Sequence, residues 1–321
     1  MRRTTAWLGA FLVAALAGGG GVVALNATVF GPGGFVRIYL DALARGDAEG
    51  ALGLPGVDAA GLDPSLLRGD VLAGLSDIRQ VSDVSLGADR HRVTMSWAAP
   101  GGDGTTTFEV ERVGTRLGLF PEWGFAQSPV AELELQVLHD PRYTANGVDA
   151  STGRTSEGTA AVAVFVPGSY RLAHDSTYLR ADAIRVIADE PGARIPARVE
   201  VEPGPAFAPA LATAVSEHLA ACTEQRVLFP TGCPFGETIA DRLASEPEWS
   251  IEHEPLLEPE PGPFGSWIAG PAPGTAHLVV DVQSLFDGSI STFDQDVPFQ
   301  ARYGIRFAGD GLAVTALDPA S

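Results

Sequence analysis

Histidine and carboxylate side chains are the groups of this chain that could carry acid–base chemistry. An imidazole moves protons near neutral pH when a carboxylate orients it. In His139–Asp140 and His174–Asp175 the two groups are adjacent, but neighbouring residues on a strand point to opposite faces. We therefore interpret both pairs as turn residues and assign no catalytic residue. The six histidines are scattered along the chain: His91, His139, His174, His218, His253 and His277.

Sequence motifs that mark a particular mechanism do not occur. The chain has no G-x-S-x-G, H-E-x-x-H, Walker, G-x-G-x-x-G or EF-hand pattern. All 21 basic residues are arginines, which excludes lysine Schiff-base and P-loop lysine chemistry. A net charge of −19 argues against nucleic acid as a partner, because phosphate contacts need clustered cations. The sequence thus predicts no cofactor and no nucleic-acid partner.

A run of glutamates alternates with prolines between Glu246 and Glu260. Calcium needs six to eight oxygens that converge from a loop with a sharp glycine turn. The prolines would instead keep this segment extended, with its carboxylates spread along it. The run favours a solvated acidic loop, with weak cation capture or docking to a basic partner as the alternatives.

The first residues predict a membrane anchor. Arg2 and Arg3 precede an uncharged run from Ala6 to Leu25, and a helix of about 20 apolar residues spans the hydrocarbon core of a bilayer. The arginines place the N-terminus in the cytoplasm and everything after it outside. Cleavage as a signal peptide after Ala17 is the alternative. We favour retention, because the apolar run continues past that site.

The two cysteines, Cys222 and Cys233, lie close together in the part predicted to be exported. A disulfide is the expected state of such a pair in an oxidising compartment. His218 lies one helical turn before Cys222, so a metal site is conceivable, but no third and fourth ligand has suitable spacing. The sequence predicts the disulfide and no metal site.

The hydrophobic pattern divides the exported part into three segments. Residues 34–128 begin with a helical stripe through Phe35, Ile38 and Tyr39 and continue with strands of period two. Residues 131–203 show only strand and turn patterns. Residues 205–321 return to a helical stripe, which contains Leu211 and Cys222, followed by a short helix at Glu237–Ala244 and strands. Residues 1–28 form the stub and anchor.

The phrase from Phe35 to Ala48, an aromatic-bearing helix followed by a Gly46–Asp47 turn and a second helix, resembles the opening of nuclear transport factor two-like proteins. The resemblance implies a cone-shaped α+β domain. Phe165–Tyr170 resembles a phrase of Gram-positive envelope proteins, which implies an actinobacterial, membrane-anchored cell-envelope protein. The expected fold class is therefore α+β, with an N-terminal transmembrane helix and two cone-like units flanking a β-rich middle.

These features favour a binding or interaction module of the cell envelope, attached to the membrane by its N-terminal helix, with an envelope protein as its partner. One alternative is an exported enzyme that works in the pocket of a cone, with His91 or His277 as the base. Such a site needs a cavity of about 300–1,000 Å³ and a carboxylate beside the histidine. The other alternative is a passive structural spacer.

Overall fold

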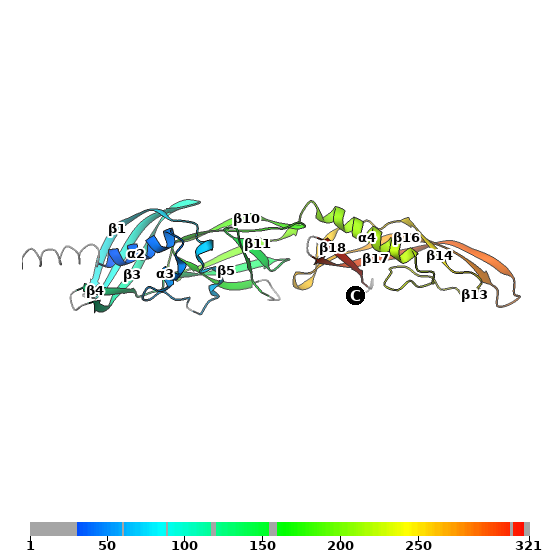
Figure 1. Cartoon of the computed structure of the whole chain (residues 1–321), viewed down its shortest axis with the longest axis horizontal. Coiled ribbons are helices and arrows are strands. Elements are labelled where there is room, and N and C mark those ends of the chain that lie inside the picture. The colour runs from blue at the N-terminus through cyan, green and yellow to red at the C-terminus, as the bar shows by residue number, and fades with distance from the viewer. Residues whose placement is uncertain are drawn as a thin grey trace, which may run out of the picture.

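The computed structural model describes residues 31–59, 61–87, 89–116, 120–153, 159–308 and 311–317. The predicted membrane segment, Ala6–Leu25, lies outside them. In the described ranges, no helix combines the length and the apolar character needed to cross a bilayer. The molecule is elongated, and its elements follow one another along the long axis roughly in chain order (Figure 1).

The first part combines one main helix with a four-stranded antiparallel meander. Pro32 suits the first turn of its helix, where a backbone N–H would lack a partner. Gly46 takes a φ of +72° after the helix end, and Asp47 then caps the next helix by accepting from the Gly50 N–H at 2.8 Å. The elements are α2 (Pro32–Ala44), α3 (Ala48–Leu52), two 3-10 turns (Pro64–Leu66 and Gly69–Val71), β1 (Ser76–Gly87), β2 (Arg90–Ala99), β3 (Gly102–Arg116) and β4 (Phe120–Phe125).

The curled sheet β1–β4 closes around the apolar face of α2. Tyr39 packs against the rings of Phe108 and Phe125, with centroids 6.1 and 5.1 Å away. Its hydroxyl group lies 3.0 Å from the carbonyl oxygen of Pro129 and 2.9 Å from that of Val166. One buried side chain therefore ties the helix to both the first sheet and the middle of the molecule.

The middle part is entirely strand and turn. One sheet has the order β12-β10-β9-β6-β7 and a second has the order β11-β5-β8, in which β11 runs parallel to β5. The apolar faces of these sheets belong to one buried cluster. The strands are β5 (Val130–Leu138), β6 (Arg142–Ala145), β7 (Val148–Ser151), β8 (Thr159–Phe165), β9 (Gly168–Asp175), β10 (Leu179–Ala188), β11 (Arg194–Glu200) and β12 (Glu202–Pro203).

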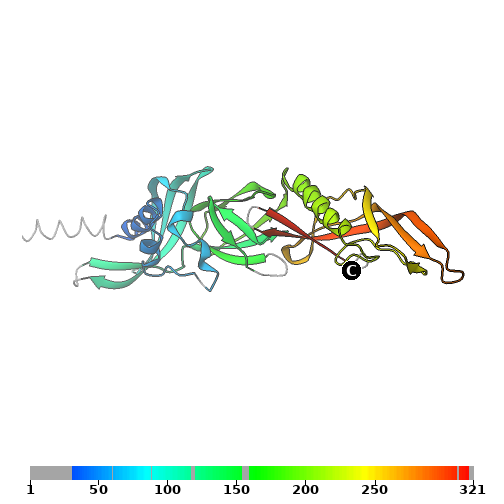
Figure 2. The same ribbon diagram turned by 45° about the vertical axis from the view of Figure 1, so that its right-hand side comes forward.

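The last part is built on two long antiparallel strands, β16 and β17, which form a ribbon that reaches the far end of the molecule (Figure 2). Helix α4 lies over it and buries Leu211, Val215 and Leu219. The elements are α4 (Phe207–Thr223), β13 (Arg242–Leu243), β14 (Glu248–His253), β15 (Pro259–Pro261), a 3-10 turn (Pro263–Gly265), β16 (Trp267–Gln283), β17 (Ile290–Ala308) and β18 (Gly311–Ala316).

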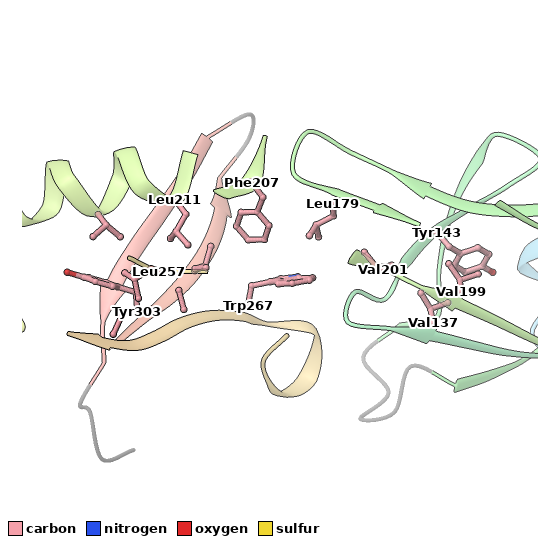
Figure 3. Packing of buried hydrophobic residues seen from close by; sticks show 14 of the residues in the cluster. Val137, Tyr143, Leu179, Val199, Val201, Phe207, Leu211, Leu257, Trp267 and Tyr303 are labelled. Carbon is pink, nitrogen blue, oxygen red and sulfur yellow. The ribbon is translucent and has the colours of Figure 1, made fainter. Parts of the chain in front are cut away.

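Aromatic side chains join the middle part to the last part. Phe207 packs on Trp267 with ring centroids 5.4 Å apart, close to Leu179 and Val201 (Figure 3). Tyr178 stacks on Phe307 at 5.7 Å. Because these contacts are buried in the same cluster as the middle sheets, the ribbon is attached through a continuous apolar core.

The predicted α+β fold class, with two cone-like units, was wrong. The described residues are mostly β, with 18 strands against three α-helices. The helix expected at Glu237–Ala244 is absent because the backbone there pairs with β16 instead: Arg242 and Leu243 form β13, and the Ala244 N–H donates to the carbonyl of Asp281 at 2.7 Å.

The substitution Tyr39→Phe tests the connection that the Tyr39 hydroxyl group makes between α2 and the carbonyl groups of Pro129 and Val166. It leaves buried carbonyl groups without their donor, so we expect the free energy of unfolding to fall by about 1–3 kcal/mol. Ile38→Ala on the exposed side of the same helix is the matched control and should change it by less than about 0.5 kcal/mol. Urea denaturation measures both, and equal effects would contradict the assigned role of the hydroxyl group.

Candidate functional site

His277 lies on the outer face of the β16–β17 ribbon, between two carboxylates of β17. Its Nδ1 atom is 2.8 Å from Oδ1 of Asp296, and its Nε2 atom is 3.1 Å from Oδ1 of Asp294. The hydrogen bond to Asp296 is the main cause of a raised pKa of His277, and the charges of Asp294, Asp296 and Glu252 act in the same direction. Both ring nitrogens are engaged, so this arrangement favours the protonated imidazole on an open surface.

His91 has a carboxylate partner that the sequence did not reveal. Its Nδ1 atom lies 2.7 Å from Oδ1 of Asp83 on the neighbouring strand, and its ring meets Trp123 edge-on at 5.2 Å. The concave face behind it is filled by aromatic side chains, Tyr39, Phe108 and Phe125 among them. A histidine–carboxylate pair is thus present at this sheet, on a face that is otherwise packed with apolar side chains.

A polar cavity of about 400 Å³ lies where the first sheet meets the turn between β10 and β11. Arg92 and His91 are adjacent on β2, so the cavity opens on the sheet face opposite His91. Glu109 in its wall accepts hydrogen bonds from Arg90 and Arg92 at 3.0 and 2.8 Å, and these arginines lower its pKa. The lining residues are Arg92, Thr105, Thr107, Glu109, Gln127, Asp189, Glu190 and Pro191.

The adjacent pairs His139–Asp140 and His174–Asp175 do not form dyads. His139 occupies a turn with a φ of +69° and contacts the carbonyl oxygen of Val201 at 2.9 Å. His174 is buried in β9 and contacts the carbonyl oxygen of Arg142 at 2.9 Å. The interpretation as turn residues holds for His139 and was wrong for His174, whose strand neighbours hold it inside the middle part.

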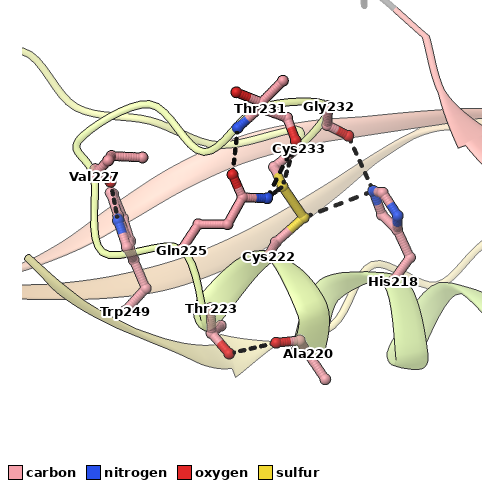
Figure 4. The surroundings of a disulfide bond; sticks show 10 residues. All are labelled: His218, Ala220, Cys222, Thr223, Gln225, Val227, Thr231, Gly232, Cys233 and Trp249. Carbon is pink, nitrogen blue, oxygen red and sulfur yellow. Dashed lines mark hydrogen bonds between the residues drawn. A yellow bond between two sulfur atoms is a disulfide. The ribbon is translucent and has the colours of Figure 1, made fainter.

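The predicted disulfide between Cys222 and Cys233 is confirmed. It joins the end of α4 to the loop that follows it, beside Gln225 and His218 (Figure 4). Nε2 of His218 lies 3.7 Å from Sγ of Cys222 and 3.1 Å from the carbonyl oxygen of Gly232. The three side chains come together as metal ligands would, but the two sulfurs are bonded to each other and offer no thiolate.

The acidic run from Glu246 to Glu260 is divided between different partners. Glu246 and Glu248 lie 3.6 and 3.5 Å from Arg226, and Glu254 accepts from the Ser216 hydroxyl at 2.8 Å. Parts of the run belong to β14 and β15. The segment is therefore held against the ribbon and is not the single solvated loop that was expected.

The turn that joins β16 to β17 exposes large apolar side chains. Leu285 is 73% exposed, Phe286 98% and Ile290 66%. The turn is ordered: the Ser284 N–H donates to the Ser289 carbonyl at 2.9 Å, and the Leu285 N–H donates to Asp241 at 3.2 Å. We call Leu285, Phe286 and Ile290 the apolar tip. Asp287–Gly288 is a turn signal in the sequence, but a turn signal alone does not show whether the side chains around it are covered.

Comparison with known proteins gives no relative: no family model matches the chain, and neither a curated protein nor a solved structure is significantly similar to it. The cavity has the volume for a small ligand but neither candidate histidine in its wall, and the apolar tip is exposed without a cavity.

Reduction of the disulfide should destabilise the chain. In the chain-entropy model, opening a loop of this size costs about 3 kcal/mol. We expect a reductant to lower the urea midpoint of the wild-type chain and to leave the Cys222→Ser/Cys233→Ser double variant unchanged. Thiols of the native chain that react with maleimide before reductant is added would contradict the bond.

The titration of His277 makes the stability of the fold depend on pH. Because its pKa is raised in the folded state, it stabilises the fold at a pH below its ordinary value of 6.5, and this contribution is lost as the pH rises through the folded-state pKa. In NMR titrations, Asp296→Asn should lower the pKa of His277. His277→Gln identifies the resonance, and an unchanged pKa in the Asp296 variant would contradict the assigned cause.

Proposed function

We propose that this chain is a membrane-anchored binding or interaction module of the cell envelope. Residues 6–25 attach it to the membrane, its body lies outside the cytoplasm, and its docking surface is the apolar tip.

The observation that carries the proposal is the exposure of Leu285 and Phe286 on an ordered turn. Complete burial of such side chains in a partner is worth roughly 1.5–3 kcal/mol each. Since the hydrogen bonds of the turn already fix its backbone, little conformational entropy is lost on binding. A rigid apolar projection of this kind suits an apolar pocket of a partner protein.

The long axis of the molecule supports the same reading. The described chain begins at one end, beside α2, and the turn between β16 and β17 lies at the opposite end (Figure 1). A chain anchored before residue 31 would hold the apolar tip far from its own membrane. A passive spacer would not need Phe286 exposed, so the tip favours docking over spacing.

The enzyme alternative has weaker support. His91 and His277 each have a carboxylate partner, as a base requires. However, the cavity of about 400 Å³ is lined by other residues, and the concave face near His91 is occupied by aromatic side chains. Neither histidine therefore lines the cavity that could enclose a substrate.

The proposal also includes two resemblances. Residues 35–48 resemble nuclear transport factor two-like proteins, and residues 165–170 resemble a phrase of envelope proteins, which implies an actinobacterial envelope protein. The position of α2 inside the curled sheet β1–β4 supports the first of these, for the first part of the chain only.

Photo-crosslinking in intact cells tests the proposal. A benzoylphenylalanine at position 286 should give a discrete adduct that protease added to whole cells degrades. The same probe at Val81, which is also exposed but lies on β1, is the matched control and should give none. Adding Leu285→Ser to the position-286 probe should weaken the adduct. Equal labelling from positions 81 and 286, or an adduct protected until lysis, would contradict the proposal.

A further inference from the structure

Strand β17 has a neighbour on both sides for only part of its length. It pairs with β16 from Ile290 onward, whereas β18 pairs with it only from Tyr303. The Leu317 N–H extends that second pairing by one residue, donating to the carbonyl of Arg302 at 2.8 Å. Within the described part of the chain, Ile290–Ala301 therefore has no strand on the side away from β16. We call this segment the open edge.

The direction of the backbone groups on the open edge follows from Arg302. Its carbonyl points toward β18, and in a strand the N–H and C=O groups of every second residue point to the same side. Thr292, Asp294 and Asp296 therefore direct their N–H and C=O groups away from β16. Pro298 fits the same alternation, because proline has no N–H group and is tolerated only where that group would face the unpaired side.

Two of the usual protections of an edge against another strand, a bulge and a covering strand, are missing from the open edge within the described residues. The pairing of β17 with β16 shows no bulge between Ile290 and Ala301, whereas the edge strand β1 has three register shifts against β2. A bulge twists an edge away from an incoming strand, and a loop or helix that covers the edge blocks the strand directly. In β17 only Pro298 and the acidic side chains interrupt an otherwise regular edge.

The charge beside the open edge selects the kind of partner. Asp294 and Asp296 are 65% and 66% exposed, and Asp281 and Glu252 lie on neighbouring strands, with His277 between them. A second copy paired edge to edge would bring these carboxylates against one another, and like charges placed opposite each other destabilise a strand pair. Arginine or lysine side chains on an added strand would instead be attracted.

We propose that the open edge of β17 accepts an extended, basic segment of a partner protein as an added β-strand. The added strand lies in line with β18 and is held by the backbone groups of Thr292, Asp294 and Asp296. Ile290 is both the start of the open edge and part of the apolar tip, so one partner can contact both surfaces. This inference rests on the proposed function and specifies how the partner is recognised.

Peptide binding to the full-length chain tests the proposal. The probe is a fluorescent, end-blocked peptide of alternating arginine and valine, as long as the open edge. A second peptide replaces two valines with proline, which prevents strand pairing but keeps the charge, and a third replaces arginine with glutamate. We expect the proline peptide to bind at least about tenfold more weakly, since several main-chain hydrogen bonds are lost, and the acidic peptide not to bind. Equal binding of the two basic peptides would overturn the proposal, as would no binding of any.

Variants of Thr292 locate the binding. Thr292→Pro removes one outward N–H and leaves the pairing with β16 intact, as Pro298 does. Thr292→Val keeps that N–H and removes only the hydroxyl group, which donates to Asp281 at 2.7 Å. We expect the proline variant to lose about tenfold in affinity and the valine variant to bind like wild type. In the wild-type chain, the basic peptide should slow amide hydrogen exchange within Ile290–Ala301, and unchanged exchange there would overturn the proposal.

Changes in the apolar tip distinguish a failure of this proposal from a failure of the proposed function. Phe286→Ser should leave binding of the arginine–valine peptide unchanged, because that peptide contacts only the open edge. If the peptide fails to bind while the crosslink from position 286 persists in cells, the open-edge proposal is wrong and the docking function stands. If the crosslink is absent while the peptide binds, the docking function at the tip is wrong.

Discussion

The contact of Tyr178 in the middle part with Phe207 and Phe307 in the last part is the interaction on which the arrangement of this molecule depends. A chain of small open sheets placed end to end has little shared surface, and such joints are mobile unless they are large and apolar. Here, the buried side chains of the middle sheets, α4 and the ribbon form one cluster. Phe207 also packs on Trp267 and Phe307 at the same place. The ribbon is therefore attached to the middle part by buried apolar contacts.

The ribbon of β16 and β17 exposes an unpaired strand edge and an apolar turn. β16 and β17 are long, and their neighbours β13, β14 and β15 pair with β16 alone. This pairing leaves β17 with an unpaired edge toward the far end. The ribbon ends there in a turn whose apolar side chains are exposed. A partner that covers either feature buries apolar surface or satisfies backbone groups, and both effects favour association.

The two histidine–aspartate pairs show why an apparent catalytic pair is insufficient evidence for catalysis. His91 and Asp83 lie at a sheet packed with aromatic side chains, and His277 lies between carboxylates on an open ribbon. General acid–base catalysis needs a substrate held within hydrogen-bond reach of the base, in a site from which water is largely excluded. The charge around His277 is better matched to binding a cation, which is also what the proposed added strand would supply.

Patterns along the chain were enough to predict the local features: the helix around Tyr39, the strands of the first sheet and of the middle part, and the disulfide of Cys222 with Cys233. Each depends on neighbours along the chain, such as hydrophobic period, turn residues or closeness of two cysteines. Three other features could be seen only in the folded chain: Glu237–Ala244 is not a helix, Asp83 lies beside His91, and Phe286 is exposed. These outcomes depend on which strand lies alongside which, and pairing between segments distant in sequence can override a local preference, because a long strand provides many backbone hydrogen bonds at once.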